Sequence, residues 1–162
     1  LPISGQFLDP GSALFTSILF EGGAPVLVVP PTRPASTSFR KLLVAWDGSA
    51  HAARAVNAAL ACFAPPAHVE ILTVTGEKDL GDSMPAASIA THIARHDVAT
   101  NVSSLAFANQ SVGATILDHA RSTGADLIVM GAYGHSRWRQ MLLGGVTDNL
   151  THGSPLPLLV AY

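Results

Sequence analysis

The chain has little charge and almost no cysteine. Only 12% of its 162 residues are charged while 48% are apolar, which argues against disorder and favours a sheet covered on both faces. The net charge of −2 gives no basic surface of the kind that binds DNA or RNA, so no nucleic acid is expected as a partner. The single cysteine, Cys62, excludes an intrachain disulfide and agrees with a cytoplasmic location; we expect it to be a small buried hydrophobe.

The chain also lacks long apolar runs and the common catalytic motifs. Mean hydropathy is +0.35, yet no apolar stretch approaches the roughly 20 residues that a membrane-spanning helix needs, so no membrane association is expected. There is no Walker-type phosphate loop, no Gly-x-Ser-x-Gly elbow and no local Cys/His pair. His92 and His96 have the spacing of helix metal ligands, but Ile93 stands where a zinc protease has glutamate. We therefore expect neither an enzyme nor a metal site.

Short apolar segments typical of buried strands alternate with longer segments of helical periodicity along most of the chain. This alternation predicts βαβ units and an α/β fold with a parallel sheet. The strands are predicted at 41–46, 69–75, 102–108, 126–130 and 156–160. The helices are predicted at 50–63, 86–96, 112–123 and 146–152, with Ser49 and Ser111 as N-caps and Gly124 as a C-terminal stop.

A Pro/Ser/Thr-rich segment at 30–38 separates a short N-terminal piece from the rest. The N-terminal piece resembles the end of the chain, because Pro25-Val26-Leu27-Val28-Val29 matches Pro157-Leu158-Leu159-Val160-Ala161. Such a match at a distance of about one domain suggests a tandem repeat, although a helix followed by proline and apolar residues is also common by coincidence. The expected organisation is residues 1–31 as the last helix and strand of a preceding copy, 32–39 as a linker, and 40–162 as one complete domain.

Two glycine clusters follow the apolar run Asp126–Met130. Gly131 and Gly134 come first, and Gly144 and Gly145 follow after a polar loop, at the start of the helix predicted over 146–152. Glycine backbone and a helix N-terminus both present N–H groups to an anion. Asp47 ends the first long strand and reaches the same sheet edge if the two strands are neighbours. The pattern indicates a nucleotide phosphate site, whereas Asp47 can also simply shape a turn before a helix.

Residues 40–162 resemble the universal stress protein (UspA-like) family. The resemblance is carried by Asp47-Gly48-Ser49, by the Gly-Ala-Asp-Leu-Ile-Val-Met-Gly run at 124–131, and by Pro-Leu-Pro-Leu-Leu-Val near the end. The family's ATP-binding pattern is Gly, two residues, Gly, nine residues, Gly, then Ser or Thr. The chain matches it up to Gly144 but has Gly145 in place of the hydroxyl residue, while Thr147 lies nearby.

The resemblance implies a Rossmann-like, adenine nucleotide α-hydrolase-like fold: an open, twisted, five-stranded parallel sheet in the order 3-2-1-4-5 with helices on both faces. It also implies a role for each matching residue. Asp47 would bond the ribose or adenine, and Val74 would contact adenine. Trp46 would either stack on the base or partly fill the pocket. The implied cofactor-binding residues are Ala45, Trp46, Asp47, Val74, Met130, Gly131, Gly134, Gly144, Gly145, Val146 and Thr147. In the loop, His135, Arg137 and Arg139 are either phosphate ligands or solvated surface residues.

Two functions follow from this resemblance. The first is a stress-response regulatory module that binds ATP, with or without Mg²⁺, and reports that state to a partner. The alternative is a dimerisation module with an unused pocket, because the last strand leaves a sheet edge open. The family resemblance suggests antiparallel pairing of last strands, so the strand at 25–29 is the expected partner of 156–160, in the same chain or in another. The expected assembly is a homodimer through these terminal strands. A hydrolase-like enzyme remains a third possibility without an identifiable nucleophile.

Overall fold

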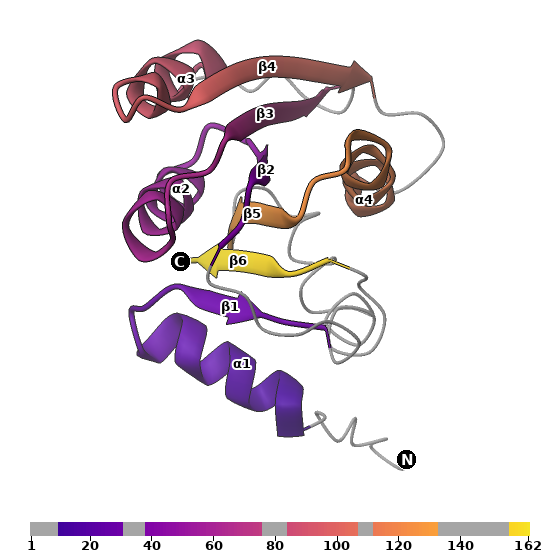
Figure 1. The fold of residues 1–162 in the computed structure, drawn as a ribbon. Helices are drawn as coiled ribbons and strands as arrows, with labels where there is room; N and C mark the ends of the chain where they lie inside the picture. The colour runs from indigo at the N-terminus through magenta and orange to yellow at the C-terminus, as the bar shows by residue number, and fades with distance from the viewer. Residues whose placement is uncertain (1–9, 31–37, 76–83, 107–111, 133–155) are drawn as a thin grey trace.

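The chain folds as an α/β domain with helices on both faces of one sheet (Figure 1). The computed structural model describes residues 10–30, 38–75, 84–106, 112–132 and 156–162. The helices are α1 (Pro10–Glu21), α2 (Ala50–Cys62), α3 (Ala86–Ala94) and α4 (Val112–Thr123). The strands are β1 (Val26–Val28), β2 (Lys41–Ala45), β3 (His68–Thr75), β4 (Ala99–Ala106), β5 (Leu127–Gly131) and β6 (Leu158–Ala161). Among these described segments, no helix is long and apolar enough to cross a membrane.

The sheet has six strands in the order β1-β6-β5-β2-β3-β4. The strands from β2 to β6 pair in parallel, whereas β1 pairs with β6 in the antiparallel direction. The expectation of a five-stranded, all-parallel sheet is therefore wrong, because β1 adds a sixth strand that is antiparallel to β6. The five parallel strands, numbered from β2 as the first, do lie in the predicted order 3-2-1-4-5. The sixth strand arises because β1, which the sequence assigns to a preceding copy, pairs with β6 of its own chain and covers that edge with apolar residues.

Two apolar clusters form the core, one on each face of the sheet. The two-residue alternation along β2 directs Leu42, Val44 and then Trp46 to the face covered by α2 and α3, and Leu43 and Ala45 to the face covered by α4. Figure 1 shows α2 and α3 on one side of the strands and α4 on the other. The alternation is thus the sequence feature that sets which side chains reach which helix layer.

The observed element bounds differ slightly from the predicted ones. β4 begins three residues earlier than expected, and α2 ends at Cys62, whose side chain is exposed rather than buried. The predicted cap of α2 is confirmed, because the Ser49 hydroxyl accepts a hydrogen bond from Ala52 N at 3.1 Å. The helix predicted over 146–152 and the cap predicted at Ser111 lie outside the described residues.

Asp126 holds the amino end of β2 beside the start of β5. Its Oδ2 accepts a hydrogen bond from Arg40 N at 2.8 Å, and its Oδ1 accepts one from Lys41 N at 3.0 Å. Its own N–H donates to Lys41 O at 2.9 Å. The Lys41 ammonium in turn donates to the carbonyl of Thr123 in the last turn of α4, where a cation is favoured. These contacts set the β2–β5 register and hence which residues meet at the opposite edge.

We predict that Asp126→Ala lowers the free energy of unfolding by about 2 kcal/mol, because two backbone N–H groups lose a charged acceptor. Urea denaturation measures this loss. Asp118→Ala is the matched control: that carboxylate is 61% exposed and pairs with Arg121 at 3.7 Å, an interaction worth at most about 1 kcal/mol. Equal losses in the two variants would contradict the role given to Asp126.

Candidate functional site

The carboxyl ends of β2 and β5 lie side by side, because Ala45 pairs with Met130 in the parallel register. Asp47 follows β2 by two residues, and Gly131 ends β5. The two residues that the sequence places at one sheet edge are therefore on neighbouring strands. In open α/β sheets this edge is where ligands bind.

The Asp47 carboxylate is 7% exposed and takes part in the turn that starts α2. Its Oδ1 accepts a hydrogen bond from Ser49 N at 3.0 Å, and Gly48 between them has a φ of +78°, which glycine adopts without strain. A carboxylate has about four acceptor positions, so this one bond leaves capacity for a ligand. The side chain shapes the turn and also remains able to accept hydrogen bonds at the edge.

Trp46 belongs to the core rather than to the opening of the site. Its side chain is 3% exposed in the cluster under α2 and α3, and its Nε1 donates to Met84 O at 2.9 Å. The Met84 N–H donates to Gly48 O at 3.2 Å, so both backbone polar groups of Met84 bond to residues just after β2. Of the two roles open to Trp46, the packing favours filling space over stacking on a base.

Ala45, Val74 and Met130 contribute to the apolar cluster on the α4 face. Ala45 and Met130 are buried, while Val74 is half-buried at its margin. The resemblance implies that these three residues shape the floor of the site or contact adenine and the sugar. The fold gathers them at the carboxyl end of the sheet, since each lies within the last two residues of its strand.

Gly131 has a packing role that the sequence reasoning missed. A Cβ placed on it would lie 2.4 Å from Ala52 N and 2.7 Å from the carbonyl carbon of His51, closer than atoms approach. The first turn of α2 thus crosses directly over the backbone of β5. The sequence assigned this glycine only to ligand approach, and no local pattern indicates which helix will cross it.

The remaining predicted binding residues lie outside the described residues. They are Gly134, Gly144, Gly145, Val146 and Thr147, together with the loop cations His135, Arg137 and Arg139. The part of the site that the structure describes is therefore the part the resemblance assigns to the base and sugar. These described residues are the Asp47 carboxylate, which accepts one hydrogen bond from Ser49 N, and the apolar residues Ala45, Val74 and Met130.

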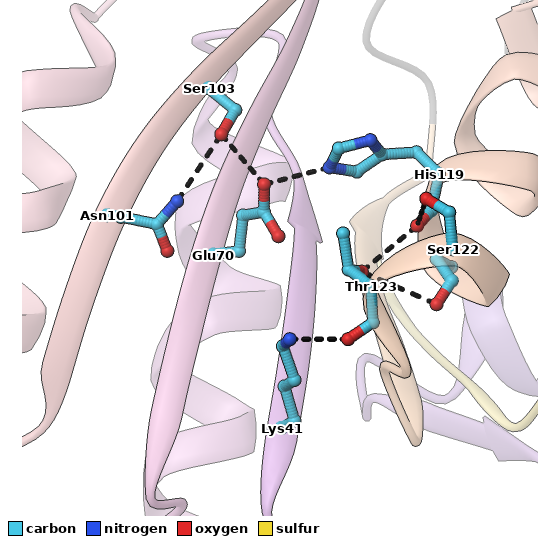
Figure 2. Close-up of polar contacts among 8 residues, drawn as sticks. Lys41, Glu70, Asn101, Ser103, His119, Ser122 and Thr123 are labelled. Atoms are coloured by element: carbon cyan, nitrogen blue, oxygen red, sulfur yellow. Dashed lines mark hydrogen bonds and ion pairs between the residues drawn. The ribbon is translucent and has the colours of Figure 1, made fainter.

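A second polar cluster lies toward the other end of the sheet, on the face that α4 covers (Figure 2). Glu70 in β3 is 6% exposed, and its Oε1 accepts hydrogen bonds from Ser103 Oγ at 2.7 Å and His119 Nε2 at 2.8 Å. Asn101 Nδ2 donates to Ser103 Oγ at 3.3 Å. Burial raises the pKa of Glu70, but the bonds from His119 and Ser103 and the nearby charges of His119 and Lys41 outweigh it and lower that pKa. The cluster joins α4 to β3 and β4.

Comparison with known families identifies residues 38–161 as a universal stress protein domain, and the chain belongs to the universal stress protein family. No curated protein matches it significantly. A universal stress protein from Archaeoglobus fulgidus DSM 4304 is similar in structure, with 21% identity, a TM-score of 0.57, and coverage of 94% of this chain. The chain spans only 57% of the length of that protein.

Two other solved structures are similar over most of their own length. A universal stress protein family member from Burkholderia pseudomallei has 22% identity and a TM-score of 0.51, with 78% of this chain and 98% of that one covered. A universal stress protein solved in complex with cAMP has 23% identity and a TM-score of 0.45, with 76% and 97% covered. At these identities the first two support the fold alone, and the third carries no argument for this chain.

We predict that Glu70→Gln makes the free energy of unfolding less sensitive to a fall in pH. A carboxyl whose pKa is lowered in the folded state stabilises the fold above its ordinary pKa, near 4.5, and this contribution is lost as pH falls through the folded-state value. The variant should be less stable than the wild type by about 2 kcal/mol at pH 7, and the difference should shrink between pH 5 and pH 3. Urea midpoints at several pH values measure it.

Glu21→Gln is the control for this experiment, because Glu21 is exposed at the end of α1 and accepts a hydrogen bond from the Ser17 hydroxyl at 2.9 Å. The difference in free energy of unfolding between Glu21→Gln and the wild type should change little over the same pH range. A Glu70→Gln difference that stays constant from pH 7 to pH 3 would contradict an ionised Glu70 in the fold.

Proposed function

We propose that this universal stress protein domain binds an adenine nucleotide, ATP with or without Mg²⁺, and acts as a stress-response regulatory module. The observation that carries the proposal is the meeting of Asp47 and Gly131 at one sheet edge, held by the β2–β5 register. Small apolar residues border that edge on the α4 side. An adenosine group needs both an apolar support for the base and acceptors for its N–H and O–H donors.

Each part of the nucleotide has candidate partners in this proposal. The free acceptor positions of Asp47 would take the ribose hydroxyls or the adenine amine, and Ala45, Val74 and Met130 would lie under the base and sugar. The phosphates would be held by the backbone N–H groups from Gly131 to Thr147, including Gly145, with Arg137 and Arg139 nearby. We propose a binding role without catalysis, because the sequence shows no motif with a catalytic nucleophile. We also propose a cytoplasmic location, with which the single cysteine agrees.

The strand pair β1–β6 favours a second function, that of an interaction module. Val26 pairs with Val160, Leu27 with Leu159, and Val28 with Leu158. When β1 is aligned with β6 by sequence, Val26 corresponds to Leu158, Leu27 to Leu159, and Val28 to Val160. The pairing is therefore unchanged when the two strands are exchanged, with its centre at Leu27 and Leu159.

A pairing of this symmetry is the kind that two identical subunits make through one edge strand each. We propose that α1 and β1 are the counterpart of the last helix and strand of a second universal stress protein domain, as in a tandem pair. The same register would let two copies of the chain join as a homodimer through the terminal strands, once β1 no longer occupies the edge of β6.

Isothermal titration calorimetry with ATP and magnesium tests the nucleotide site. Gly144→Val should abolish binding, because its side chain blocks the approach of a phosphate to the main chain. Asp47→Ala should weaken binding about tenfold through the loss of a charged acceptor. Asp118→Ala, on the outer surface of α4, should bind like the wild type. Unchanged affinity in Gly144→Val would count against the site, and a wild-type protein that ignores ATP would overturn the nucleotide function.

Cysteine crosslinking tests the symmetric pairing, in a protein that carries Cys62→Ser and Leu27→Pro so that β1 is displaced. Leu159→Cys should then give a covalent dimer on oxidation, because residue 159 faces its own copy at the centre of an antiparallel β6–β6 pair. Leu158→Cys, one residue from the centre, should give little dimer. Equal crosslinking at both positions, or none at 159, would exclude this register.

A further inference from the structure

The ring of Tyr162 lies between α1 and α2. It packs edge-on against Phe20 of α1, with ring centroids 4.9 Å apart and planes at 82°. It stacks on His51 of α2 with centroids 4.7 Å apart and planes at 15°. A stacked ring and an edge-on ring are both favourable aromatic geometries. Tyr162 therefore bridges the helix that accompanies β1 and the first turn of the helix that follows Asp47.

The same first turn of α2 is in contact with the candidate site. The backbone and Cβ of His51 lie against Gly131, where even a methyl group would not fit. Gly131 pairs with Ala161 of β6, and the next residue, Ala132, donates its N–H to Ala161 O at 2.7 Å. A continuous set of packed groups thus runs from α1 through Tyr162 and His51 to the end of β5.

We infer that Tyr162 is a positioning residue that couples the packing of α1 and β1 on the β6 edge to the geometry of the carboxyl-edge site. The two states are α1 packed on Tyr162 and α1 displaced from it. The two coupled places are the β6 edge, where β1 packs, and the turn at the start of α2 that carries Asp47. The ligand at the second site is the adenine nucleotide, so this part of the inference rests on the proposed function.

The coupling follows from the absence of free space under α2. Because its backbone touches Gly131 without a gap, the first turn cannot shift toward the sheet, and loss of the stacked Tyr162 ring frees it only to move away. Such a movement carries Ser49 and the Asp47 carboxylate with it, since both are bonded within that turn. Coupling of this kind is reciprocal, so a ligand at the edge also strengthens the packing of α1 and β1.

Three variants of the full chain test the inference. Tyr162→Ala and Phe20→Ala remove the two ring contacts, whereas Leu14→Ala changes a side chain of α1 that is 61% exposed. We expect hydrogen exchange of the Ala52 and Ala132 amides to quicken in the first two variants only. The dissociation constant for ATP should rise about two- to tenfold in the same two variants. Tyr162→Phe keeps the ring and should restore wild-type behaviour in both measurements.

The outcomes separate the inference from the function it rests on. If the wild type does not bind ATP, the proposed function fails, and the exchange rates alone decide the coupling. If the wild type binds ATP but Tyr162→Ala and Phe20→Ala leave both measurements unchanged, the coupling is overturned and the nucleotide site stands. Reciprocity adds one more check, because ATP should slow the exchange of the Val26–Val28 amides in the wild type and not in Tyr162→Ala.

Discussion

The arrangement of the domain depends on the close contact between the first turn of α2 and the backbone at Gly131. With any side chain at that position, the helix would lie farther from β5 and the turn that begins it would move with it. Because the helix start is fixed there, the Ser49 cap and the Asp47 carboxylate are fixed as well. The contact therefore determines where an acidic group stands relative to the end of the neighbouring strand.

The opposite end of the sheet is held by polar groups of a different kind. Asp126 bonds two successive backbone N–H groups, Lys41 reaches the last turn of α4, and Glu70 joins three elements through Ser103 and His119 (Figure 2). Of these charged groups Glu70 is buried, so its desolvation has a cost that the hydrogen bonds from Ser103 and His119 offset, and this favours one arrangement of the three side chains. The strands are thus aligned at their amino ends, and the carboxyl ends inherit that alignment. The positions of Asp47 and Gly131 thus depend on residues at the far end of the same strands.

Much of this fold could be predicted from the sequence because the governing patterns are local. Alternating apolar residues in 41–46 and the cap at Ser49 determine a strand and a helix start without reference to the rest of the chain. The pairing of the strand at 25–29 with the last strand was also predicted, but not whether it forms within one chain, since its apolar residues suit either its own chain or another. The roles of Gly131 and Glu70 also depend on partners far away in the sequence: α2 for the first, and β4 and α4 for the second. That Asp47 and Gly131 lie at the ends of neighbouring strands at one edge was predictable only through the rule for parallel sheets.

The symmetric register of β1 and β6 has an evolutionary consequence. In a pair of identical subunits, one substitution in the edge strand occurs in both subunits, so it changes the contacts on both sides of the symmetry axis. Here the two strands are separate stretches of one chain, and Val26 and Leu158 already differ although they occupy equivalent places. Each strand can therefore accumulate its own changes while its partner compensates. Such independence allows the two strands of the pair to differ in sequence while they keep the same register.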